Sequence, residues 1–326
     1  MNKEKSKDYS ISILRLISTI LIVSCHFLQY FGNQLAWNLN IGVQIFLIIS
    51  GFLYGLRYEQ ISIKKVWENF KKIIFDYYIF CILALTLNLI FNFAEFEFTY
   101  VIRLLLIIGT IPGIEHLWFI PLILFCYLIC PFLSFFLQEI NHKKYKIIHK
   151  VAFIGIFTII NIYMFPYFGI ECTLCFVSAF LFANEIKDIK LFFVKYGLFL
   201  ILMTSILHYV LYFTNFFDET LFITSKISFF TISNLIRACT ALCLFVSFYF
   251  FVSFVKFRKN ISFLNFTDKY SYSIYLCHQI FILGPLSLLS LTNFKFINIL
   301  LSAIAITLLT FLLNILSISL KKKPSH

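Results

Sequence analysis

An arginine and a histidine interrupt the first long apolar segment of the chain, Ile11 to Tyr30. A charged side chain at bilayer depth costs roughly 2.5–3.5 kcal/mol, so such residues are usually functional. Arg15 and His26 are 11 residues apart, which on a helix places them on one face, about 16 Å apart along the axis. An imidazole titrates near neutral pH and can act as a general base. Arg15 alone is equally well explained by snorkelling to headgroups, and His26 alone by a structural hydrogen bond, so it is the pair that indicates a site.

Two later apolar segments carry further polar residues. The sequence EHLW at 115–118 places His116 and Trp118 at the expected outer end of the fourth segment. In the ninth segment Tyr275 and His278 lie three residues apart, on one polar stripe of a helix. Trp118 alone is typical of an interfacial anchor, and His278 alone of a buried structural histidine. We predict that all four contact a polar substrate.

The composition predicts a polytopic membrane protein. Of 326 residues, 61% are hydrophobic and 13% are charged, and 44 are phenylalanine. A water-soluble domain of this length cannot bury so much apolar surface. We expect an all-α bundle of about ten transmembrane helices that forms a single membrane domain over residues 1–326. The bundle would cover residues 11–320, with one cytoplasmic tail at 1–10 and a second at 321–326. We expect the first tail to be retained, because no small-residue cleavage site follows the first apolar run.

The expected spans are defined by hydropathy. They cover residues 11–30, 41–57, 73–93, 116–138, 147–165, 169–184, 191–213, 229–255, 270–290 and 296–320. The external segment 94–115 holds a short apolar piece, 101–111, which is too short to span and is expected to be re-entrant or to lie against the bundle.

The net charge of +12 follows this topology. Of the 27 lysines and arginines, 22 fall in the two tails or in the loops after even-numbered spans. The positive-inside rule therefore places both termini in the cytoplasm of a cell (inner or plasma) membrane. We expect the bilayer, and not a nucleic acid, to be the partner of this charge.

The cysteines point neither to a disulfide framework nor to a metal. There are nine, an odd number, scattered mostly through the spans. Cys172 and Cys175 form a CxxC without a second CxxC or a nearby histidine pair, so we expect no bound metal or cofactor.

The second span and the loop after it carry small and basic residues. Ser50 and Gly51 allow close approach of a backbone or a ligand. The following segment, 64–72, reads as a basic amphipathic connector, in which Lys71 and Lys72 can bind lipid headgroups or the phosphates of a soluble donor. Gln44 is an amide that needs buried partners, and packing is its simplest role.

Four stretches, taken in order, resemble the bacterial-type membrane-bound acyltransferase-3 family. They are Arg15-x10-His26, FLIISGF at 46–52, HLWFIP at 116–121 and SYSIYLCH at 271–278. The resemblance runs over nearly the whole chain and implies ten helices that move an acyl group, usually acetyl, from cytoplasmic acetyl-CoA to an acceptor at the membrane.

The resemblance also implies roles for residues. His26 matches the family's essential histidine and Arg15 its paired cation, while the donor site would be lined by Arg15, Ser50, Gly51, Lys71 and Lys72. The chain departs from the family pattern in two places. Relatives tend to carry Arg-x-x-Arg followed by a proline at the positions where this chain has Asn69, Lys72 and Asp76. Relatives also often carry an acidic residue where this chain has Gln44. Lysine lacks the bidentate geometry of arginine.

The resemblance implies an O-acetyltransferase that acts on a capsule, O-antigen or exopolysaccharide hydroxyl, with His26 as general base. In such a reaction we expect His116, Trp118, Tyr275 and His278 to contact the acceptor or to stabilise the oxyanion. Direct transfer and an acetyl-histidine intermediate both fit the residues. The alternative is a transporter or flippase for a lipid-linked saccharide or an anionic metabolite, since buried His and Arg also suit a proton relay. The acceptor, the acetylated position, acyl groups other than acetyl and the oligomeric state do not follow from the sequence.

Overall fold

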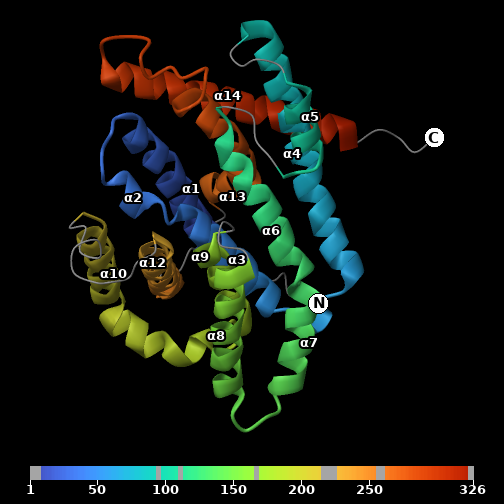
Figure 1. Cartoon of the computed structure of the whole chain (residues 1–326), viewed down its shortest axis with the longest axis vertical. Coiled ribbons are helices and arrows are strands. Elements are labelled where there is room, and N and C mark those ends of the chain that lie inside the picture. Colours follow the sequence, from blue (N-terminus) through green and yellow to red (C-terminus); the bar gives the residue numbers. More distant parts are fainter. Residues whose placement is uncertain are drawn as a thin grey trace. The chain divides into compact units, whose positions relative to one another are not determined.

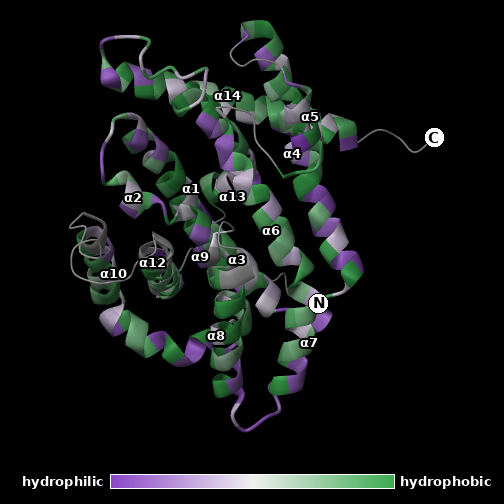
Figure 2. Ribbon diagram, viewed as in Figure 1, coloured by the Kyte–Doolittle hydropathy of each residue, from purple (hydrophilic) through white to green (hydrophobic). Residues whose placement is uncertain are grey.

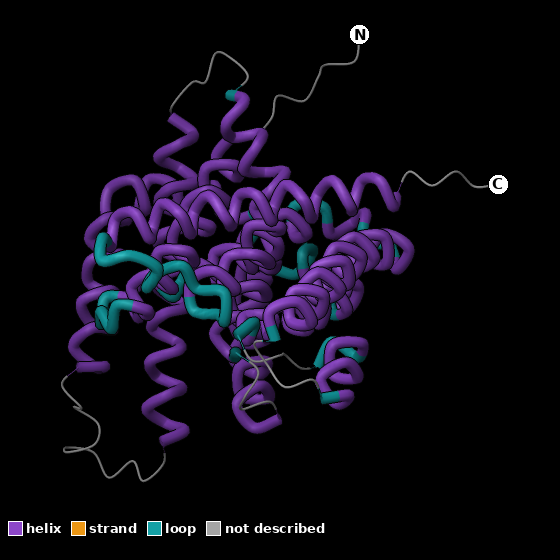
Figure 3. Tube along the Cα trace, turned by 90° about the horizontal axis from the view of Figure 1, so that it is seen from above, coloured by secondary structure: helices purple, strands orange, loops and turns teal. Residues whose placement is uncertain are grey.

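A computed structural model describes residues 9–92, 97–108, 113–164, 169–213, 226–254 and 261–321. These ranges contain helices and connecting turns but no strand (Figure 3). The chain divides into two compact units. The first comprises Met1–Ser18, Asn40–Ile61 and Ile129–Asp268, and the second comprises Thr19–Leu39, Ser62–Leu128 and Lys269–His326.

The first unit is built mainly from the middle of the chain (Figure 1). Its helices are α3 (Gly42–Gly55), α7 (Cys130–Ile140), α8 (Lys146–Met164), α9 (Ile170–Leu181), α10 (Lys190–Phe213) and α12 (Lys226–Phe254), with the short 3-10 helices η1 (Tyr58–Gln60) and η3 (Glu185–Ile189). The beginnings of α1 (Tyr9–Tyr30) and of α13 (Ser262–Ile282) also belong to it.

The second unit contains the remaining parts of α1 and α13. It also holds α2 (Ala36–Leu39), α4 (Ile63–Phe91), α5 (Phe98–Leu105), η2 (Glu115–Trp118), α6 (Phe119–Leu128) and α14 (Lys295–Lys321). Helices α1 and α13 thus each contribute residues to both units.

The helices confirm the predicted all-α polytopic membrane class. Within the described ranges, seven segments are long and apolar enough to cross a bilayer. They are Tyr9–Tyr30, Ala36–Gly55, Ile63–Phe91, Glu115–Ile140, Glu185–Val210, Ile232–Val252 and Lys295–Lys321. Figure 2 shows these helices as mostly hydrophobic and the turn between α7 and α8 as hydrophilic. The count of ten spans and the cytoplasmic termini stay predictions.

The helices differ from the expected segments in detail. The expected fourth span, 116–138, lies within the single apolar segment Glu115–Ile140, but this segment is built from two helices, α6 and α7, which separate at Ile129 because Pro131 has no N–H for the helical ladder. The ninth span begins and ends eight residues earlier than expected, at Ser262 and Ile282, since Gly284 and Pro285 follow it. The basic connector at 64–72 is the first part of α4, whose N-cap Ser62 accepts a hydrogen bond from Lys65 N–H at 3.2 Å.

The apolar piece after α4 lies against α4 and does not span. Helix α5 has eight residues, about 12 Å of length against a hydrocarbon core of about 30 Å. Tyr77 and Tyr78 of α4 donate hydroxyl hydrogen bonds to the carbonyls of Leu104 and Leu105, at 3.0 and 2.7 Å. The described part of this segment therefore contacts α4, and whether it is re-entrant stays a prediction.

Two glycines bring α3 and α9 into backbone contact. Gly51 and Gly55 are four residues apart on α3 and are both buried. A Cβ atom built on either would lie 2.2 Å from a carbonyl oxygen of α9, that of Phe176 or of Phe180. This is the small-xxx-small geometry of membrane helix pairs, and it fixes the core of the first unit.

Candidate active site

Three histidines meet in the second unit. His26 comes from α1, His116 from η2 and His278 from α13. The ring of His278 lies 4.9 Å from that of His26 and 5.0 Å from that of His116, centroid to centroid. His278 is 0% exposed and His116 3%, whereas His26 is partly exposed. The sequence separated these residues by 90 and 162 positions, and the fold brings them together.

Apolar packing holds α1 in place on both sides of His26. Val23 and Phe27 pack against a buried cluster made of Ile282, Leu289 and Ile306. The partial burial of these side chains stabilises the contact in proportion to the apolar area removed from water. The imidazole of His26 is thereby carried on a fixed backbone and remains partly accessible.

Hydrogen bonds define which nitrogen of each ring carries the proton. His278 Nδ1–H donates to the Tyr275 carbonyl at 2.6 Å, and His116 Nε2–H donates to the Leu276 carbonyl at 3.0 Å. His26 Nδ1–H donates to the Gln29 side-chain oxygen at 2.7 Å. Since carbonyl oxygens only accept, the second nitrogen of each ring carries a lone pair when the ring is neutral. In His26 this is Nε2, the atom that a general base would use.

The backbone of η2 is fixed by α13. The Tyr275 hydroxyl donates to the His116 carbonyl, and the Gln279 side-chain oxygen accepts from the His116 N–H at 3.1 Å. The Gln279 amide nitrogen also donates to Glu115 at 3.0 Å, and Glu115 accepts from the Gly113 N–H at 2.8 Å. Gln279 was missed in the sequence, although an amide next to His278 inside an apolar helix was a usable signal.

Arg15 has an acidic partner that the sequence analysis also missed. In the first unit, Arg15 Nη1 lies 3.1 Å from Asp268 Oδ1, and the Ser12 hydroxyl donates to Asp268 Oδ2 at 2.7 Å. The two charged side chains are 30% and 15% exposed. Asp268 lies three residues before Ser271, so it continues the polar stripe of α13 by one more helical turn.

The other predicted residues lie on α3, α4 and η2. Trp118 is 45% exposed, and Lys71 lies over the Trp67 ring at 5.5 Å. Lys72 is exposed on α4, and Ser50 is half-buried on α3. Gly51 has a packing role against α9. The donor-site role of these residues stays a prediction, as does the contact of Trp118 with an acceptor.

Neither the cysteines nor the acidic residues assemble a metal site in the part of the chain that the structure describes. No group of three His, Cys, Asp or Glu side chains there is arranged to hold a metal ion. Cys172 and Cys175 are buried thiols that form no disulfide.

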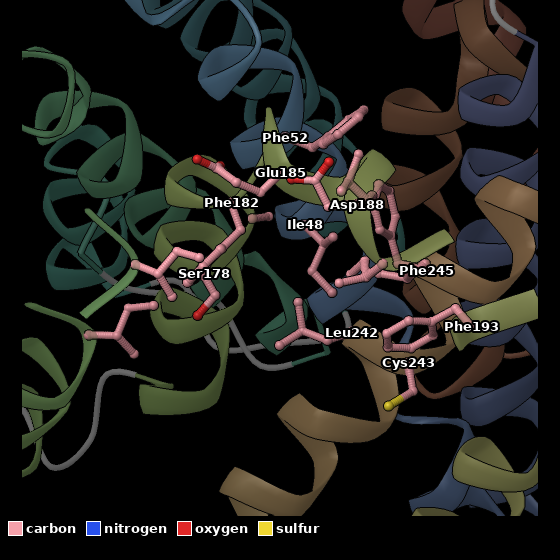
Figure 4. A pocket seen from close by; sticks show the side chains of 16 residues that line it. Ile48, Phe52, Ser178, Phe182, Glu185, Asp188, Phe193, Leu242, Cys243 and Phe245 are labelled. Carbon is pink, nitrogen blue, oxygen red and sulfur yellow. The ribbon is translucent and has the colours of Figure 1, made fainter. Parts of the chain in front are cut away.

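The first unit contains an apolar cavity of about 510 Å³. Figure 4 shows Phe193, Leu242 and Phe245 among its walls, with the carboxylates of Glu185 and Asp188. Its walls come from α3, α8, α9, η3, α10 and α12 and include none of the predicted site residues.

Comparison with known proteins gives one result. The acyltransferase-3 model, described as an acyltransferase domain, matches residues 8–318. Comparisons with curated proteins and with solved structures gave no match. The matched range includes the histidine cluster and the Arg15–Asp268 pair, and it supports acyl transfer over the transporter alternative.

Proposed function

The chain belongs to the acyltransferase-3 family and is a multi-pass membrane acyltransferase, and we propose that it moves acetyl from cytoplasmic acetyl-CoA to a hydroxyl of a cell-surface glycan. The glycan would be a capsule, O-antigen or exopolysaccharide sugar, free or lipid-linked. Acetyl-CoA would be a co-substrate, with no cofactor held by the protein. The cell membrane and cytoplasmic termini are part of the proposal and rest on the distribution of lysine and arginine.

The observation that carries this proposal is the state of His26. Its Nδ1–H is engaged by Gln29, its Nε2 is left with a lone pair, and the ring is partly exposed on a helix inside the matched range. A positioned imidazole with a free nitrogen is the arrangement that general-base catalysis requires.

The reaction would proceed in two balanced steps. His26 Nε2 removes the proton of the acceptor hydroxyl while the oxygen attacks the thioester carbonyl carbon. The carbon–sulfur bond then breaks, and the leaving thiolate takes the proton from the His26 imidazolium. The products are the acetyl ester and CoA. In the alternative route His26 is acetylated first, and the acceptor then takes the acetyl group from it.

The proposed contacts with the acetyl-CoA donor are made by Arg15, Ser50, Gly51, Lys71 and Lys72. Cations suit the phosphates of CoA, and Lys71 and Lys72 are exposed on the first turns of α4. On the acceptor side, His116, Trp118, Tyr275 and His278 are proposed to bind the hydroxyl compound or to stabilise the oxyanion.

Label transfer in membranes tests the proposal. Membranes with the wild type, His26→Ala or the control His149→Ala would receive radiolabelled acetyl-CoA and a crude glycan or lipid-linked acceptor fraction. His149 suits the control because it is exposed and its ring donates to the carbonyl of Tyr145, the residue just before its own helix α8. We expect label in the acceptor with the wild type and His149→Ala but not with His26→Ala. Equal transfer by His26→Ala would remove His26 from the chemistry.

An acid quench without acceptor separates the two routes. Direct transfer predicts no label on the protein, whereas an acetyl-histidine intermediate predicts label on the wild type that is absent from His26→Ala.

A further inference from the structure

The apolar cavity of the first unit contains none of the residues proposed for acyl transfer, yet it has the dimensions of a ligand site. Its volume of about 510 Å³ falls within the range of about 300–1,000 Å³ of ligand sites, which are mostly apolar with a few polar groups. On α8 the wall includes Ile147, next to the first residue of the helix, and Ile154. Because seven helical residues rise about 10 Å, the cavity extends for about that length from the end of α8.

The charged groups of the cavity wall are two carboxylates on the same side. Figure 4 shows Glu185 and Asp188 of η3 on one side of the cavity, and Leu242 and Cys243 of α12 on the opposite side. Asp188 is exposed, and it forms no ion pair within the part of the chain that the structure describes. The cavity is therefore amphipathic, with an anionic edge and an apolar interior.

Glu185 has one oxygen paired and one without a donor. Its Oε1 accepts from Lys150 Nζ at 2.7 Å and lies 3.3 Å from Lys146 Nζ. Its Oε2 is buried and finds no hydrogen-bond partner among the described residues. Buried polar atoms without a partner are rare, and each one needs an explanation. Since a carboxylate oxygen only accepts, the missing group at this wall is a donor, and an ammonium supplies three N–H groups.

Lysines at the same end of the cavity suit a phosphate beside that ammonium. Lys187 lies between the two carboxylates in the sequence and is exposed, and the Lys146 side chain is 42% exposed. Both lysines follow even-numbered spans, so the charge distribution predicts that this end lies at the level of the cytoplasmic headgroups. The end thus offers cations for a phosphate and carboxylates for an ammonium, next to an apolar space.

We propose that this cavity binds an ethanolamine phospholipid of the bilayer. An acyl chain lies along the apolar wall, the ammonium donates to Asp188 and to Glu185 Oε2, and the phosphate lies beside Lys187 and Lys146. A phospholipid without an ammonium would bring an anion to two carboxylates and leave Glu185 Oε2 without a donor. This binding is independent of the proposed acyl transfer, so either proposal can fail without the other.

Native mass spectrometry of the purified full-length protein tests this binding. The protein in detergent would receive equal amounts of palmitoyl-oleoyl phosphatidylethanolamine and phosphatidylglycerol, and in a second sample phosphatidylethanolamine and phosphatidylcholine. We expect the first bound lipid to be phosphatidylethanolamine by about fivefold in both, the upper value for one exposed ion pair. Phosphatidylcholine competes poorly because its ammonium has no N–H to donate. Equal occupancy in either sample, or a preference for phosphatidylglycerol, would overturn the proposal.

Variants locate the preference. Asp188→Asn keeps the size of the side chain and should reduce the preference over phosphatidylglycerol to less than about twofold. Glu139→Gln is the matched control, because Glu139 is an exposed carboxylate near the end of α7 that does not line the cavity, and it should bind as the wild type does. A wild-type preference in Asp188→Asn, or an equal loss in Glu139→Gln, would refute the assignment.

A filled cavity tests the place of the acyl chain. Ala179 is a small residue of the wall, and Ala179→Leu should lose the first bound phosphatidylethanolamine. A folded Ala179→Leu protein that binds phosphatidylethanolamine with wild-type occupancy would overturn the proposal. If Ala179→Leu did not fold, Asp188→Asn would still decide, since Asp188 is exposed.

Discussion

Replacing Gly51 by alanine tests the contact between α3 and α9. The added Cβ would lie 2.2 Å from the Phe176 carbonyl oxygen and 3.0 Å from its carbonyl carbon, whereas ordinary van der Waals contact begins at 3.4 Å. The obstructing atoms are backbone, so no side chain can turn away, and the helices would have to separate by roughly 1 Å. Overpacking of this kind costs about 1–3 kcal/mol, and we take the upper end because backbone meets backbone.

The helix propensity of alanine offsets part of that cost. Alanine is favoured over glycine by about 1 kcal/mol in a helix interior, which leaves a net destabilisation of about 2 kcal/mol. For a large domain this corresponds to a fall in Tm of roughly 4–8 °C. The assay is thermal aggregation of the detergent-solubilised protein, followed by size-exclusion chromatography of the fraction that stays monodisperse.

Two further glycines supply controls. Gly155→Ala on α8 meets no atom within 4 Å and should leave Tm unchanged or raise it. Gly55→Ala places its Cβ 2.2 Å from the Phe180 carbonyl oxygen and should behave like Gly51→Ala. A Gly51→Ala protein that melts with the wild type would refute the packing argument. If Gly51→Ala lost far more activity than Gly55→Ala at equal stability, Gly51 would have the predicted donor-site role in addition.

Two buried or half-buried ion pairs give further predictions. Asp268→Asn keeps the size of the side chain but leaves Arg15 without this counter-charge. We expect the free energy of unfolding to fall by about 1.5–3 kcal/mol, the range for a hydrogen bond to a charged group. A melting curve equal to that of the wild type would contradict this expectation. Arg237 and Glu171, 3.1 Å apart and 9% and 8% exposed, form a pair inside the first unit, so Arg237→Met should cost about 3–5 kcal/mol by leaving a buried carboxylate unpaired. The double variant Arg237→Met, Glu171→Leu should recover most of that stability, and a double variant as unstable as the single one would show that the charge pair is not the cause.

The membrane class of the protein was predictable because composition and hydropathy depend only on how many apolar and charged residues each segment contains. With 61% hydrophobic residues, no soluble alternative remained. Helix boundaries were less predictable, since hydropathy averages over a window and does not register single backbone positions. Pro131 divides an apolar run that the window reads as continuous, and Gly284 and Pro285 end α13 inside another.

The histidine cluster was predictable in its members but not in its contacts. His26, His116 and His278 stood out as ionisable residues in apolar surroundings. Their proximity depends on η2, whose backbone is held by Tyr275 and Gln279. A hydrogen bond from a side chain to a backbone carbonyl 159 positions away leaves no local pattern in a sequence.

Asp268 shows where the same reasoning stopped too early. The predicted stripe on α13 names Tyr275 and His278, yet residues 268, 271, 275 and 278 follow one another at helical spacings of three, four and three. Helix α1 carries a cation and an imidazole 11 residues apart, and α13 carries a carboxylate and an imidazole ten residues apart. Within the first unit the cation pairs with the carboxylate, and within the second unit the two imidazoles meet. Each helix therefore supplies one member of both polar pairs, so the α13 stripe specifies the partners of α1 as well as the site.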